Sequence, residues 1–271
     1  MPLGYRPLPP LNIACSGQSV TGRKEEWPAL ANGNSRLLEG MDKLYDLFRQ
    51  APHLGSLIDP RREAGDLFTA GFSELRPLLE KALAKEKVKQ DADATAVGVA
   101  AQGITKAAEL LSTEYTLVAT NVPFLTRSKQ ADILKDYCEK QHPRAKNELA
   151  TAFVERCTAF TKLAGTAAFV SPQSWLFLAA YTWLRADLLE NYVFNFVVKL
   201  GPAAFDDMNW WAATTMLGIV THSLPDGSSS MAFTDVSPPR NVIQKAALLL
   251  SQDVQSYRQS SQLRNPDHRI G

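Results

Sequence analysis

The sequence predicts an α/β protein, because short apolar runs alternate with amphipathic helical segments along its second half. The strand candidates are residues 115–119, 166–171, 192–199, 212–220 and 231–236. The helix candidates between and after them are residues 131–141, 148–162, 175–189 and 241–257. Because helices connect successive strands, this order predicts a mainly parallel sheet.

The first half of the chain has a different pattern. Residues 9–17 predict a short strand that ends in a turn of small residues. Residues 37–49 carry apolar side chains at helical spacing, and residues 66–84 and 99–111 also predict helices. We therefore expect a helical insertion over residues 18–113.

The amino-acid composition limits the classes of protein to which the chain can belong. Of the 271 residues, 45% are hydrophobic and 21% charged, and the formal net charge is +1, as in an ordinary globular protein. A local groove can still be basic on a neutral chain. The three cysteines are widely spaced and the four histidines follow no ligand pattern, so we predict no metal site and a reducing cytoplasm. No signal peptide and no apolar run of spanning length is visible, so we expect no membrane partner.

The stretch TNVPFL, residues 120–125, directly follows the first of these strand candidates. Ligands of open α/β sheets bind beyond the carboxyl ends of the strands. Asn121 offers a side-chain acceptor, and the carbonyl of Val122 is a second acceptor beside the rigid Pro123. Phe124 adds a flat face. Two acceptors beside an aromatic ring suit a planar base that carries an exocyclic amine. The alternative is a plain strand-to-loop turn with Phe124 in the core.

These four residues resemble the Asn-Pro-Pro-Tyr/Phe signature of adenine-specific, amino-methylating DNA methyltransferases, with Val122 in place of the first proline. The resemblance covers roughly residues 117–220 and is greatest to the large adenine methylases of restriction and phage-exclusion systems, of the Eco57I-like and BREX or DISARM type. The further segments that resemble the family, in order, are residues 145–157, 165–177, 181–189 and 197–207.

The resemblance implies methyl transfer from S-adenosylmethionine to the amine of an adenine flipped out of double-stranded DNA, in a prokaryotic cytoplasm. Asn121, Val122, Pro123 and Phe124 would form the catalytic turn, with Phe124 stacking on the base. By the same resemblance Phe205 would cover the other face of the base; the alternative is a core phenylalanine. Val122 keeps the carbonyl acceptor but removes the stiffness of the first proline.

A basic stretch follows the catalytic turn. Residues 127–146 hold six Lys or Arg and three acidic residues, a formal charge of +3. A phosphate backbone would run past this point, so Arg127 and Lys129 are predicted DNA-backbone contacts. The alternative is a solvated helix face.

The family binds its cofactor with a Gly-rich turn after its first strand, and we find no such turn before Asn121. The chain therefore resembles a truncated or split piece whose fourth strand has an open edge. We expect either a partner chain that supplies the cofactor-binding half or poor stability of the chain alone. Two alternatives remain: a catalytically inactive DNA-binding or scaffold fragment, and an unrelated helical interaction protein. The expected parts are a third-strand remnant over 1–17, the helical insertion over 18–113, a catalytic half over 114–236, and a helix and tail over 237–271 that lead to an absent target-recognition region.

Overall fold

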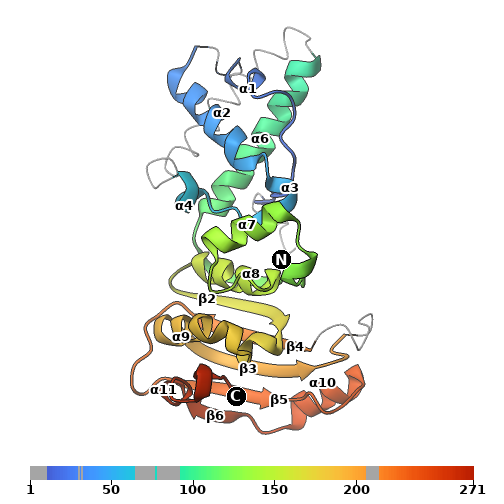
Figure 1. Cartoon of the computed structure of the whole chain (residues 1–271), viewed down its shortest axis with the longest axis vertical. Helices are drawn as coiled ribbons and strands as arrows, with labels where there is room; N and C mark the ends of the chain where they lie inside the picture. The colour runs from blue at the N-terminus through green and yellow to red at the C-terminus, as the bar shows by residue number, and fades with distance from the viewer. Residues whose placement is uncertain (1–10, 30, 32, 65–76, 78–91, 206–213) are drawn as a thin grey trace, which may run out of the picture. The chain divides into compact units, whose positions relative to one another are not determined.

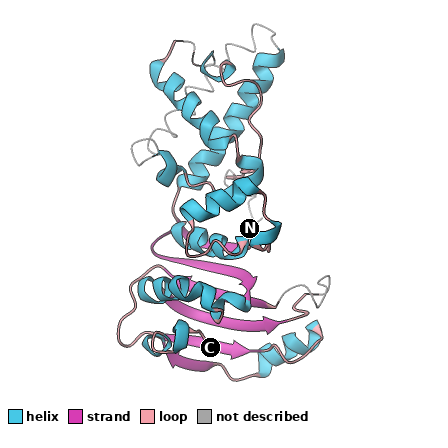
Figure 2. Cartoon of the chain, in the orientation of Figure 1, coloured by secondary structure: helices cyan, strands magenta, loops and turns pink. Residues whose placement is uncertain are grey.

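The computed structural model describes residues 11–29, 31, 33–64, 77, 92–205 and 214–271. The chain divides into two compact units, Met1–Thr113 and Glu114–Gly271. Among the described residues, the first unit holds helices and loops, and every strand belongs to the second unit (Figure 2).

Helices α2 (Ser35–Phe48) and α6 (Ala92–Ser112) are the long helices in the described part of the first unit. Asn34 caps α2 by accepting a hydrogen bond from the backbone of Leu37. The helices predicted over 37–49 and 99–111 are thereby confirmed, whereas residues 66–84, apart from residue 77, lie outside the described residues. The short helices of this unit are α1 (Glu26–Ala29), α3 (Ala51–Leu54) and α4 (Pro60–Ala64).

The strand predicted over residues 9–17 is wrong where the structure describes it. Residues 11–17 form no strand, and Leu11 and Ile13 are 76% and 75% exposed. A strand needs a neighbour for its backbone hydrogen bonds, and the described residues provide none here. The expected third-strand remnant over residues 1–17 therefore has no counterpart in the described structure.

The second unit contains a six-stranded sheet in the order β1-β2-β4-β3-β5-β6 (Figure 1). Its strands are β1 (Tyr115–Asn121), β2 (Thr161–Pro172), β3 (Val193–Gly201), β4 (Thr215–Thr221), β5 (Ser230–Asp235) and β6 (Gln255–Arg258). β1 pairs with β2, and β3 with β5, in parallel; β4 lies antiparallel between β2 and β3, and β6 is antiparallel to β5. The α/β class is confirmed, but the pairing is mixed and not mainly parallel.

Helices α8 (Leu149–Ala159) and α9 (Thr182–Asn191) cover one face of this sheet and bury the larger core cluster. On the opposite face, α10 (Val242–Ser251) packs Leu248 against the smaller cluster around Val198. The helix expected over 241–257 thus ends early, and the sheet continues through β6. Helix α7 (Asp132–Gln141) precedes α8, and the short α11 (Gln259–Gln262) follows β6.

One row of side chains crosses the sheet on the α8–α9 face. Phe169 of β2 pairs with Gly218 of β4, which pairs with Val197 of β3. A Cβ atom on Gly218 would lie 2.6 Å from Cε2 and 2.7 Å from Cζ of Phe169. Glycine at this position therefore gives the buried ring its space, and so fixes the distance between β2 and β4 in the core.

We expect Gly218→Ala to lower the free energy of unfolding by about 1–3 kcal/mol, because the added methyl group displaces the Phe169 ring in a packed core. Urea unfolding followed by tryptophan fluorescence measures this. Gly227→Ala is the matched control, since no atom lies within 4 Å of its Cβ position. Equal stability of the two variants would contradict the close approach.

Candidate functional site

The candidate site begins at the carboxyl end of β1. Asn121 pairs with Val170 of β2, and the backbone N–H of Val122 then donates a hydrogen bond to the carbonyl of Val170 at 3.2 Å. A proline at 122 has no N–H and could not make this bond. Val122 is also buried in the core cluster, 3% exposed. Valine therefore extends the β1–β2 ladder by one residue into the turn.

The turn presents two acceptors. The side chain of Asn121 is exposed, and within the described residues it has no hydrogen-bond partner, nor has the carbonyl of Val122. Pro123 is exposed, and Phe124 is half-buried against the core cluster. The arrangement places an amide oxygen, a backbone carbonyl and part of an aromatic ring together at one strand end.

The loop behind this turn is fixed to the start of α8. The carbonyl of Leu125 accepts hydrogen bonds from the backbone of Leu149 at 2.9 Å and from Nε2 of Gln130 at 3.1 Å. The backbone N–H of Arg127 donates to the carbonyl of Asn147 at 3.1 Å. The turn at Asn121–Phe124 is thus held by β2 on one side and by α8 on the other.

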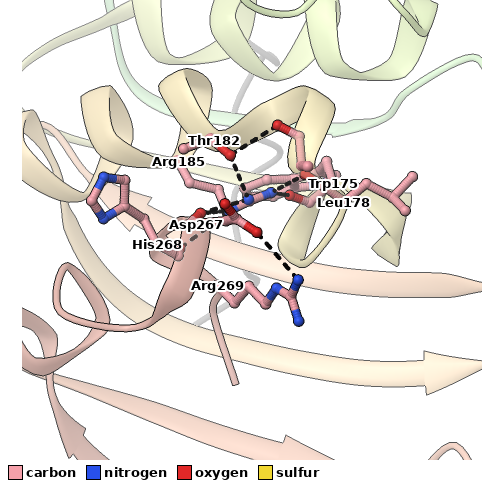
Figure 3. A network of polar contacts seen from close by, with 8 residues as sticks. Trp175, Leu178, Thr182, Arg185, Asp267, His268 and Arg269 are labelled. Atoms are coloured by element: carbon pink, nitrogen blue, oxygen red, sulfur yellow. Dashed lines mark hydrogen bonds and ion pairs between the residues drawn. The ribbon is translucent and has the colours of Figure 1, made fainter.

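A buried arginine fixes the neighbouring turn, after β2. Arg185 of α9 is fully buried, and its guanidinium donates to the carbonyls of Trp175 and Leu178 and to those of Asp267 and His268 near the C-terminus (Figure 3). In one continuous helix, the carbonyls of Trp175 and Leu178 would accept hydrogen bonds from backbone N–H groups of the same helix. The predicted helix over 175–189 is accordingly replaced by two 3-10 turns, Gln173–Leu176 and Ala179–Tyr181, followed by α9.

Two ionisable side chains lie near the start of α8. Burial raises the pKa of Glu148 above its ordinary value. Burial, followed by the negative charge of Glu148, raises the pKa of Tyr181 to about 12, so this phenol stays protonated at neutral pH. Burial causes both shifts, and negative charge adds to that of Tyr181, so both side chains favour their protonated forms more than in water.

Phe205 is 43% exposed and lies just beyond β3. β3 runs in the same direction as β1, so both strands end at the same edge of the sheet. Three inter-strand spacings, about 14 Å, separate them in the order β1-β2-β4-β3. The fold brings Phe205 to the edge that carries Asn121 and Phe124 but not to a strand adjacent to β1.

The two residues predicted to contact the DNA backbone, Arg127 and Lys129, have different surroundings. Arg127 forms an ion pair with Glu139 of α7, with Nη2 2.7 Å from Oε2. Lys129 is exposed in the 3-10 turn Arg127–Lys129. Its ammonium has no partner among the described residues.

A cofactor cradle is not visible in the described residues. Before Asn121 they contain no strand that leads through a Gly-rich turn into a helix. They also contain no cluster of three or more metal-ligating side chains, and none of their helices has the length and apolar character that a bilayer span requires. The described sheet edge therefore presents two acceptors and an aromatic ring without a nucleotide-binding turn.

Comparison with known proteins identifies relatives of this chain. The profile of the family described as "Eco57I restriction-modification methylase" matches residues 67–205, just over half of the chain. The adenine-specific methyltransferase BrxX of Escherichia coli O9:H4 (strain HS) is 28% identical over 195 residues, which are 72% of this chain and 16% of the relative. PglX of Lacticaseibacillus casei (strain Zhang), also an adenine-specific methyltransferase, is 27% identical over 119 residues, 44% of this chain and 10% of the relative. The chain thus spans less than a fifth of the length of either relative.

Among solved structures, the cryo-EM structure of a DrdV–DNA complex is similar at a TM-score of 0.47 and 14% identity. The similarity covers 59% of this chain and 19% of that chain.

Val122→Pro restores the family tetrapeptide and removes the hydrogen bond to Val170. We expect it to lower the free energy of unfolding by about 0.5–1.5 kcal/mol, the usual net value of one such bond. Urea unfolding measures this, with Val122→Ala as a control that keeps the N–H while removing buried methyl groups. An unfolding free energy equal to or above that of the unchanged chain would contradict the role of this N–H.

Removing the guanidinium of Arg185 takes the side-chain donor away from four carbonyls, those of Trp175, Leu178, Asp267 and His268, of which, within the described residues, only the Leu178 carbonyl keeps a backbone donor, the N–H of Tyr181. We expect Arg185→Met to lower the free energy of unfolding by about 2–4 kcal/mol. Arg185→Lys should recover only a minor part, because one ammonium cannot reach carbonyls on both sides of α9. Full rescue by lysine in the same urea titration would contradict the clamp.

Proposed function

The chain belongs to the Eco57I restriction-modification methylase family, and on that premise we propose that it forms the amine-holding part of a DNA adenine methyltransferase in a restriction or phage-defence system of a prokaryotic cytoplasm. The observation that carries the proposal is the pair of unpartnered acceptors at the end of β1, the Asn121 side chain and the Val122 carbonyl. The names of the adenine-specific relatives support the choice of base.

In this proposal the two acceptors take the two hydrogens of the exocyclic amine of a flipped adenine. Their dipoles direct the nitrogen lone pair away from the protein and stabilise the positive charge that develops on nitrogen as it is alkylated. Pro123 sets the direction of the Val122 carbonyl, and Phe124 stacks on one face of the base. Because the β1–β2 ladder extends to Val122, the acceptors are oriented before the base arrives.

Phe205 is the proposed contact for the other face of the base, and Arg127 and Lys129 are the proposed contacts for the phosphate backbone. All four features, the turn, Phe124, Phe205 and the basic loop, follow strand ends at a single edge of the sheet or lie directly behind them. Double-stranded DNA is thus the proposed macromolecular substrate.

S-Adenosylmethionine is the proposed methyl donor and supplies an electrophilic methyl group to the amine. The described residues do not fit it with a Gly-rich turn, so we propose that a partner segment or chain holds it. β1 supports this partner: among the described residues it pairs on one edge only, and Leu117 on one of its faces is 62% exposed. Parallel strands are normally covered on both faces, so β1 offers the docking position.

The second candidate function is a catalytically inactive DNA-binding or scaffold component of the same kind of system. The absence of a nucleotide-binding turn from the described residues favours it. The two functions share the adenine-holding turn and differ in whether a methyl group is transferred.

We expect the purified chain to bind a fluorescent duplex with one unpaired adenine about tenfold more tightly than the same duplex carrying N6,N6-dimethyladenine, which has no amine hydrogens. Asn121→Ala should remove most of this difference, because it deletes one acceptor. Fluorescence anisotropy measures both affinities.

Phe124→Leu is the matched control, since it should weaken binding of both duplexes and leave their ratio unchanged. Equal affinity of the unchanged chain for the two duplexes would contradict the proposed site. Mass spectrometry of N6-methyladenine in the DNA of a host that expresses the chain together with the partner that holds the methyl donor separates the methyltransferase from the inactive component. In the methyltransferase, Asn121→Ala should lower methylation about 10²–10³-fold.

A further inference from the structure

A single carboxylate joins two basic side chains just behind the catalytic turn. Oε2 of Glu139 lies 2.7 Å from Nη2 of Arg127, and Oε1 lies 2.7 Å from Nζ of Lys146. The three side chains are 52%, 33% and 34% exposed, respectively. Each oxygen of the carboxylate therefore holds one cation at a solvent-accessible position.

The two basic residues are fixed relative to each other by the backbone, independently of Glu139. The N–H of Arg127 donates to the carbonyl of Asn147, and Thr126 forms an antiparallel bridge with Glu148. Two short antiparallel segments thus bring Arg127 beside Lys146. Nη1 of Arg127 is buried and has no hydrogen-bond partner among the described residues, so the guanidinium retains an unused donor.

A phosphate group resembles the Glu139 carboxylate, because it has at least two oxygens on one atom and each oxygen can face a different cation. A phosphodiester accepts from a guanidinium and an ammonium in the same way. Hydrogen bonds and charge from Lys146 and Arg127 lower the pKa of Glu139, so the carboxylate is ionised at neutral pH. Exposed ion pairs are weak, so another anion can replace the Glu139 carboxylate beside the two cations.

We propose that Arg127 and Lys146 form a phosphate site for the DNA backbone and that Glu139 occupies this site until a phosphate displaces it. The inference rests on the proposed function for its ligand and goes beyond it in two ways. It adds Lys146 to the interface, and it gives an acidic residue of α7 the role of an internal competitor. Phosphates that the rest of the interface positions well exchange with Glu139, whereas loosely held phosphates do not. The competitor therefore reduces indiscriminate binding.

The test is Glu139→Gln, which keeps the size of the side chain and removes its charge. We expect it to tighten binding of a 20-base-pair fluorescent duplex about three- to tenfold at 0.1 M salt, measured by fluorescence anisotropy with the full chain. Glu39→Gln is the matched control: Glu39 pairs with Lys43 at 2.6 Å on the exposed side of α2, and its loss changes the net charge equally. An equal gain in both variants would overturn the proposal.

A second experiment tests whether the effect of Glu139→Gln depends on Arg127 and Lys146. In an Arg127→Gln/Lys146→Gln background, Glu139→Gln should give no gain, and the slope of log K against log salt should be smaller by about 2 than in the unchanged chain. Lys146→Gln alone repeats the test without disturbing the partly buried arginine. A gain from Glu139→Gln that persists without the cations would overturn the proposal.

Inorganic phosphate is the second probe. If it competes with the duplex more strongly than chloride at equal ionic strength, and more so in Glu139→Gln, the site binds a single phosphate. If it competes only as chloride does while the gain of Glu139→Gln is kept, the site is specific to phosphates held in a DNA chain.

The outcomes separate this inference from the proposed function. An unchanged affinity in Glu139→Gln, with the preference for unpaired adenine intact, overturns the competitor and leaves the function standing. A gain in Glu139→Gln without any preference for adenine keeps the phosphate site and contradicts the function. Failure of every variant to bind duplex DNA overturns both.

Discussion

The single ladder between β1 and β2 is the constraint on which the candidate site depends. Within the described residues β1 has no other strand neighbour, so its pairing with β2 sets the direction in which the chain enters the turn, while the start of α8 holds the loop behind it. Val122 makes this pairing one residue longer than proline would allow. The departure from the family tetrapeptide thus exchanges the stiffness of a proline ring for a hydrogen bond and a buried side chain.

The position of β2 depends in turn on contacts from distant parts of the chain. Phe169 fits over Gly218, and Arg185 joins the turn after β2 to residues near the C-terminus. The backbone N–H of Ile270, which is buried, also donates to the carbonyl of Leu176. The last residues of the chain therefore help to hold the turn after β2, and they belong to the same compact unit as the candidate site.

Much of this fold could be predicted from the sequence, because apolar strands and amphipathic helices have distinct periods. β1, β3, β4 and β5 lie where expected. β6 was missed because its four residues are polar and mostly exposed, so they give no apolar signal. The strand expected at residues 9–17 had the apolar pattern but lacks a neighbour. The role of Arg185 could not be predicted from the sequence, where it is one charged residue in a leucine-rich segment. Its partners are backbone carbonyls, and a sequence does not show which carbonyls a side chain will reach.

The spacing of strands also tests whether the two proposed aromatic contacts can serve one base. Aromatic pairs lie about 4.5–7 Å apart between ring centres, and the longer values belong to edge-to-face contacts, so two rings that stack on one base lie nearer to about 9 than to about 14 Å apart. β1 and β3 are about 14 Å apart, so the loop after β3 has to bring Phe205 closer to β1 for both rings to contact one base. A base held by Asn121 would then lie over the end of β2, between Phe124 and Phe205. Arg185 holds the turn that follows β2, so in the proposed function it would support the base from the protein side without contacting it.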